Sequence, residues 1–170
     1  MQKSLNGCLR CALGALGLLL SLSLPANEPA TLSSYIGMLT LGSYVEALPD
    51  DSGQMSFDDA VAAESAGRFK QLDGESINNG FTTRTFWYRL QLLYNVPAGG
   101  VSSDWVLELA YPPLDEIDLY IVRAGLDRQL IQLGDQRPRS PAQLDHHNDA
   151  VPLRLLHGER ATLSLRVRTA

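Results

Sequence analysis

The residues from 104 to 123 constrain the fold most, because apolar and polar side chains alternate along them in two runs. The apolar members are Trp105, Leu107 and Leu109 in the first run and Ile117, Leu119 and Ile121 in the second. A period of two with one apolar face is typical of β-strands half-buried against a core. Pro112 and Pro113 separate the runs and have no backbone N–H. We therefore predict a crossing between two sheets here instead of a tight hairpin.

Similar runs recur along the chain, at 41–48, 85–94, 129–133, 151–155 and 161–167. In 85–94 the core face is predicted to hold Phe86, Tyr88, Leu90, Leu92 and Tyr94, with Trp87, Arg89 and Gln91 on the opposite face. Ser56 and Asp59 have the spacing of a capping box and predict one short helix to about Glu64. Some seven or eight short strands with almost no helix indicate an all-β, antiparallel β-sandwich.

The N-terminus has the layout of a secretory signal peptide. Lys3 and Arg10 precede an apolar segment from Ala12 to Leu24, and a small residue, Ala26, offers a cleavage point. We predict a signal peptide over 1–26, followed by a loose lead-in at 27–41. The alternative is an uncleaved inner-membrane anchor, but the apolar run falls short of the roughly 20 residues that span a bilayer.

Composition narrows the classes of function. Cys8 and Cys11 both lie in the predicted leader, so the exported domain would contain no cysteine and no disulfide. Loss of the leader's two basic residues, Lys3 and Arg10, changes the formal net charge from −5 to −7. An acidic exported domain is a poor candidate for binding nucleic acid or anionic lipid surfaces.

A series of short motifs, in order and spacing, resembles the type-two extracellular sensor domain of bacterial seven-helix transmembrane receptors with diverse intracellular signalling modules. The resemblance covers roughly residues 42 to 170. Its motifs are Tyr44-Val45-Glu46, Ser52-Gly53, Phe57-Asp58-Asp59, Gly80-Phe81, Trp87-Tyr88-Arg89, Trp105-Val106-Leu107, Tyr111-Pro112-Pro113-Leu114-Asp115, Asp118-Leu119-Tyr120, Gly134-Asp135, Arg137-Pro138 and Leu165-Arg166-Val167.

The resemblance implies a jelly-roll sandwich, similar to carbohydrate-binding modules, that lies in the periplasm before seven membrane helices and a cytoplasmic output module. This chain instead ends at Ala170 and has no later apolar run of spanning length. We therefore expect a receptor fragment or a free-standing domain that meets the membrane only through segments absent from this chain. The closing strand at 161–168 is expected to be incomplete, with unpaired backbone groups and marginal stability.

Six residues are the candidates for a ligand site: Trp87, Arg89, Asp135, Arg137, His146 and Arg166. Aromatic rings with Arg or Asp hydrogen bonds recognise sugars, and Arg side chains recognise small acids. The expected partner is thus a small carbohydrate or an organic or amino acid. In the alternative interpretation, Arg89, Asp135 and Arg166 pair with each other and merely close the sandwich.

Neither a metal nor another cofactor is expected. His146 and His147 are metal-ligand types, but neighbours on an extended chain point to opposite sides, so the run Asp145–Asp149 is interpreted as a polar loop. Asp50, Asp51, Asp58 and Asp59 offer oxygen ligands without the spacing of an EF-hand, and are interpreted as a solvated surface.

The sequence predicts a binding function and no enzyme, because nucleophile-elbow, zinc-protease and phosphate-loop motifs are absent from it. We predict the periplasmic ligand-sensing domain of a bacterial signal-transduction receptor, here without its membrane and output modules. The alternative is a structural or protein-interaction module with no small ligand, for which a homodimer is the expected assembly.

Overall fold

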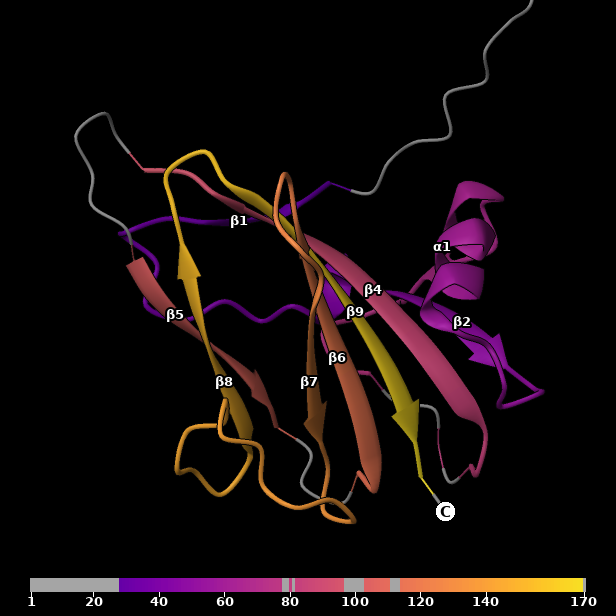
Figure 1. Ribbon diagram of the computed structural model, residues 1–170. Coiled ribbons are helices and arrows are strands. Elements are labelled where there is room, and N and C mark those ends of the chain that lie inside the picture. Colours follow the sequence, from indigo (N-terminus) through magenta and orange to yellow (C-terminus); the bar gives the residue numbers. More distant parts are fainter. Residues whose placement is uncertain (1–27, 78–79, 81, 97–102, 111–113, 170) are drawn as a thin grey trace, which may run out of the picture.

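The structure, a computed structural model, describes residues 28–77, 80, 82–96, 103–110 and 114–169 (Figure 1). The predicted signal peptide, 1–26, lies outside the described residues. The elements are β1 (Ala30–Leu32), the 3-10 helix η1 (Gly42–Tyr44), β2 (Glu46–Asp50), α1 (Phe57–Ser65), β3 (Lys70–Gln71), β4 (Thr85–Tyr94), β5 (Ser103–Leu109), β6 (Glu116–Arg123), β7 (Gln129–Leu133), β8 (Asp149–Leu155) and β9 (Arg160–Arg168).

Two sheets and one helix form three layers. The larger sheet has the strand order β3-β2-β4-β9-β6-β7, with β1 added in parallel along β4, and β5 pairs with β8 in a separate two-stranded sheet. Figure 1 shows β5 and β8 on one side of the larger sheet and α1 on the other. All described pairings except that of β1 are antiparallel. The predicted all-β antiparallel sandwich with one short helix is confirmed, whereas jelly-roll connectivity stays a prediction.

The main core fills the space between the two sheets, and the alternation in the sequence identifies its members. Leu90 and Leu92 of β4, Leu119 of β6 and Leu163 of β9 come from the larger sheet, and Leu155 of β8 comes from the smaller one; all are almost fully buried. Successive strand residues point to opposite faces, so a period of two places every second side chain in this core. The predicted core faces are therefore confirmed.

A second, smaller core lies on the other face of the larger sheet. Helix α1 begins where the sequence predicts, at a capping box in which the Ser56 hydroxyl accepts from Asp59 N and the Asp59 carboxylate accepts from Ser56 N. Ala60 and Ala63 are its buried residues, and they pack with Leu48 and Trp87. These small side chains allow the helix to lie close to the sheet.

The chain changes sheets between β5 and β6, as the two prolines predict. β5 ends at Leu109 in the smaller sheet, and β6 begins at Glu116 in the larger one. Pro112 and Pro113 themselves lie outside the described residues. The crossing follows from the sheet to which each strand belongs.

Two expectations about the ends of the domain need correction. The lead-in includes β1, whose Ala30 and Leu32 are buried against the end of β4. The closing strand, β9, was expected to have unpaired edge groups, but it lies in the middle of the larger sheet between β4 and β6. The expectation failed because strand order is a property of the sheet and cannot be inferred from position in the chain.

Candidate functional site

The six predicted ligand residues do not form one site. Trp87, Arg89 and Arg166 lie on the face of the larger sheet that carries α1, where Trp87 is part of the smaller core. Asp135, Arg137 and His146 instead line a hollow formed by the long connection from β7 to β8. Of the six predicted residues, only Asp135, Arg137 and His146 share one hollow.

Trp87 does project from the face opposite the main core, as predicted, but α1 covers it completely and its exposure is 0 %. Its ring stacks on Tyr120 with centroids 5.7 Å apart, and Phe57 meets it edge-on at 6.4 Å. The bare aromatic side chain that the sequence predicted is thus covered by protein. In this arrangement a ligand cannot reach the indole ring, so the proposed stacking role is wrong.

The two arginines of this face hold neighbouring elements together. Arg89 is buried between two carboxylates, with Nη1 3.0 Å from Glu46 of β2 and Nη2 2.5 Å from Glu64 of α1. Arg166 donates to the Gly53 carbonyl at 2.8 Å and pairs with Asp118 at 3.5 Å. Both arginines therefore form structural ion pairs, as in the alternative interpretation of the sequence, but neither pairs with Asp135.

The hollow has a volume of about 230 Å³ and is lined mainly by polar residues. Its lining residues are Gly134, Asp135, Arg137, Arg139, Gln143, His146, His147, Asn148 and Asp149. The loop begins with a close backbone approach: Asp135 N donates to Leu114 O at 3.0 Å and Gln136 N to Asp115 O at 3.1 Å. These bonds attach the loop to the segment that leads into β6.

Arg137 occupies the side of the hollow next to β6. Its Nη1 lies 2.6 Å from Asp118 Oδ1 and 3.0 Å from the Ile117 carbonyl, and its Nη2 lies 3.4 Å from Glu116. The side chain is 19 % exposed. A guanidinium has five N–H donors, so these contacts position Arg137 while donor capacity remains for a ligand.

Arg139 and Gln143 shape the rest of the loop. Arg139 donates to the carbonyls of Leu144 and His146, both at 2.8 Å, and pairs with Asp145. Gln143 donates to Asp149, the first residue of β8. Burial raises the pKa of Asp149 above its ordinary value, although the backbone of Gly134 and nearby Arg139 act against that shift.

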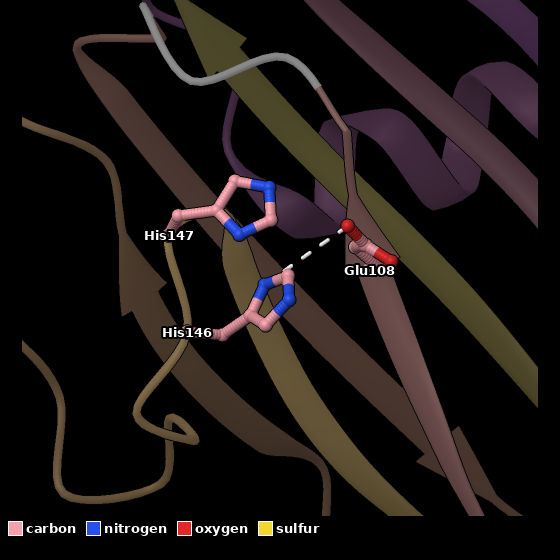
Figure 2. A group of neighbouring side chains, drawn as sticks. All are labelled: Glu108, His146 and His147. Carbon is pink, nitrogen blue, oxygen red and sulfur yellow. Dashed lines mark ion pairs between the residues drawn. The ribbon is translucent and has the colours of Figure 1, made fainter.

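At one rim of the hollow, His146 and His147 meet Glu108 (Figure 2). The sequence predicted that the two histidines point to opposite sides, but their ring centroids lie 4.1 Å apart. The prediction assumed an extended chain, whereas these residues lie on a bend of the loop before β8. Sequence reasoning missed Glu108, because it lies far back in the chain on β5 and no local motif links it to the histidines.

A second hollow, of about 550 Å³, lies beside α1 and the end of β2 and includes Asp50, Asp51 and Asp59. Asp50 accepts from the backbone of Ser52, Gly53 and Met55 and from the Ser52 hydroxyl. Burial acts to raise the pKa of Asp50, but these hydrogen bonds outweigh it, so the pKa lies below its ordinary value.

The other aspartates of this region also have protein partners. Asp51 pairs with Arg84, Asp58 with Arg128, and Asp59 caps α1. The carboxylates of this hollow therefore support the turn and the helix start. We take the first hollow as the candidate binding site, because more polar side chains line it.

Comparison with known proteins adds one positive finding. A family model described as 7TMR-DISM extracellular 2 matches residues 42–170, which is most of the chain. A search of curated proteins found no match. Among the described residues, the structure has no helix of the length and apolarity needed to cross a bilayer.

Proposed function

The chain belongs to the 7TMR-DISM extracellular 2 family, an extracellular sensor domain of receptors, and from that membership we propose that it senses a small ligand in the bacterial periplasm. The family model carries this proposal, because its match spans every element from η1 to β9. The same membership places the domain outside the cytoplasm. We propose that residues 1–26 direct its export and that it performs no catalysis.

The ligand site that we propose is the hollow in the loop between β7 and β8. Its side chains supply both kinds of hydrogen-bonding group: carboxylates of Asp135 and Asp149 as acceptors, and the guanidinium of Arg137 as a donor. Sugar hydroxyls donate to carboxylates, and the carboxylate of a small acid accepts from a guanidinium. A small carbohydrate or an organic or amino acid suits this combination.

The volume supports a ligand of this size. About 230 Å³ is below the usual range for drug-sized molecules, roughly 300–1,000 Å³, and suits one sugar ring or one small acid. The loop is held at its start by backbone bonds to residues 114 and 115 and at its end by β8. Because the loop is fixed at both ends, less conformational entropy is lost when a ligand binds.

A thermal-shift screen of the full chain against sugars, organic acids and amino acids tests the proposal. A ligand at 100 times its Kd stabilises the folded state by about 2.7 kcal/mol, which raises the melting temperature by several degrees in a domain of this size. Asp135→Ala should abolish that shift. Its side chain is exposed on the hollow, so the unliganded protein should keep its melting temperature.

Asp127→Ala is the matched control, since Asp127 is exposed in the turn between β6 and β7, away from the hollow. It should leave the ligand response unchanged. If no compound from these classes stabilises a well-folded sample, direct sensing by this hollow is wrong. A concentration-dependent dimer in light scattering, together with that negative screen, would instead support the interaction module.

A further inference from the structure

We propose that Glu108, His146 and His147 form a binding site for a divalent late first-row transition ion, with Zn²⁺ as the expected occupant. This inference goes beyond the sensing of an organic ligand and does not depend on it. The three side chains come from two distant parts of the sequence. They meet at the rim of the loop between β7 and β8, as Figure 2 shows.

The antiparallel register between β5 and β8 brings these residues together. Glu108 lies opposite Ala150, and Leu109 lies opposite Asp149, the first residue of β8. His146 and His147 precede that strand and are separated from it only by Asn148. The carboxylate of β5 and the two imidazoles of the loop therefore reach the same point because of the strand pairing.

The distances suit a metal ion after small side-chain adjustments. One ligating atom from each residue lies within 4.8 Å of the other two, and His146 Nδ1 is 4.0 Å from Glu108 Oε1. Tetrahedral Zn²⁺ has bonds of about 2.0–2.2 Å, which places its ligand atoms roughly 3.3–3.6 Å apart. The side chains of His146 and Glu108 are 40 % and 45 % exposed, so rotation about χ angles can close the difference.

The buried residue Asn148 forms hydrogen bonds with two of the proposed ligands, Glu108 and His146. Asn148 is 8 % exposed; its side chain donates to Glu108 Oε1 at 2.6 Å, and its backbone N–H donates to His146 Nδ1 at 3.2 Å. The first bond holds the carboxylate, and the second shows that the lone pair of His146 Nδ1 accepts the Asn148 backbone N–H. An ion would take over that lone pair in place of the weak hydrogen bond. Such outer partners are typical of metal sites.

The donor set defines the class of ion. Two imidazole nitrogens and one carboxylate oxygen suit Zn²⁺, Cu²⁺ or Ni²⁺, whereas Ca²⁺ and Mg²⁺ require mainly oxygen ligands. Three protein ligands leave a fourth position for water or another exchangeable group.

Isothermal titration of tag-free full chain with ZnCl₂ tests this site, after chelator treatment and with no organic ligand present. The protein should carry Cys8→Ser and Cys11→Ser, because those two thiols are themselves potential zinc ligands. We expect one Zn²⁺ per chain, no comparable binding of CaCl₂ or MgCl₂, and a higher melting temperature with zinc. His146→Ala, His147→Ala and Glu108→Gln should each weaken zinc binding by about tenfold or more.

The third histidine provides a matched control. His157 lies in the turn before β9, where it accepts from Val96 N, and His157→Gln should leave zinc affinity unchanged. Asp135→Ala should also bind zinc normally, which separates this test from that of the organic ligand. The proposal is overturned if His146→Ala and His147→Ala, folded by circular dichroism, bind zinc as tightly as the parent protein. It is equally overturned if the parent binds no zinc or binds calcium as tightly.

Discussion

Arg137 and Asp118 form an ion pair in which Nη1 lies 2.6 Å from Oδ1, and this pair joins the candidate site to the sheet. Asp118 is 8 % exposed on β6, and its other oxygen lies 3.5 Å from Arg166 of β9. Gln132 of β7 donates to the same carboxylate at 3.3 Å. One carboxylate thus connects three neighbouring strands with the loop that lines the hollow.

Replacing that carboxylate should destabilise the domain. Asp118→Asn keeps the shape of the side chain but removes the negative charge that Arg137 and Arg166 share. The amide NH₂ of the new side chain would also face the N–H donors of one of these guanidinium groups. We expect a loss of about 1–3 kcal/mol in the free energy of unfolding, measured by urea denaturation. Asp127→Asn, at an exposed turn position, should change stability by less than about 0.5 kcal/mol. Equal stability of the two variants would show that the network contributes nothing.

Trp87 should be the most costly side chain to remove from the smaller core. Trp87→Ala would leave a cavity between the sheet and α1 and should cost about 3–5 kcal/mol. Trp87→Phe should cost less, because it keeps a ring and removes an indole N–H that has no hydrogen-bond partner among the described residues. Leu126→Ala, at a side chain that is 63 % exposed, is the control. A loss below about 1 kcal/mol for Trp87→Ala would contradict the burial of this ring.

Asp50 should make stability depend on pH at the acidic end. Its folded pKa lies below the ordinary value of about 4, so its contribution is present above about pH 4 and is lost as pH falls through the folded pKa. Asp50→Asn would turn an N–H group toward Met55 N and should cost about 1–2 kcal/mol at neutral pH. The difference between parent and variant should shrink below pH 4 in urea denaturation. A difference in stability that grows below pH 4 would contradict a lowered pKa for Asp50 in the folded state.

Gly134 should tolerate no side chain. Its φ is 109°, and a Cβ atom there would lie 2.4 Å from the Asp115 carbonyl oxygen. Gly134→Ala therefore combines backbone strain with a collision and should cost more than about 3 kcal/mol. Gly158 also has a positive φ, 74°, but has open space around it, so Gly158→Ala should cost only about 1 kcal/mol. Similar melting temperatures for the two variants would contradict the close approach at Gly134.

Local pattern was enough to identify the longer strands, their buried faces and the start of the helix, but not β1. Leu90, Leu119 and Leu163 were assigned to the core from alternation alone, and the Ser56–Asp59 capping box was read directly from its spacing. These features depend on residues within a few positions of each other. The backbone geometry of a strand or helix fixes the direction in which each successive side chain points. Spacing within a few residues therefore assigns a side chain to a face without knowledge of the rest of the chain.

The candidate site was predictable only in part. Asp135, Arg137 and His146 were selected for residue type, and the structure brings them to one hollow. Trp87 was selected for the same reason, but α1 packs over it, and nothing in the neighbouring sequence states which face of the sheet a helix will cover. An exposed aromatic side chain and a covered one have the same local pattern.

Tertiary structure alone decided the partners of the charged side chains and the place of each strand in the sheet. Glu108 meets His146 because β5 pairs with β8 in one particular register, and β9 lies between β4 and β6 instead of at an edge. Pairing between distant segments is selected by the summed burial and hydrogen bonding of whole sheets. A shift of one residue would turn every side chain to the opposite face, so these contacts exist only once the complete fold has set the register.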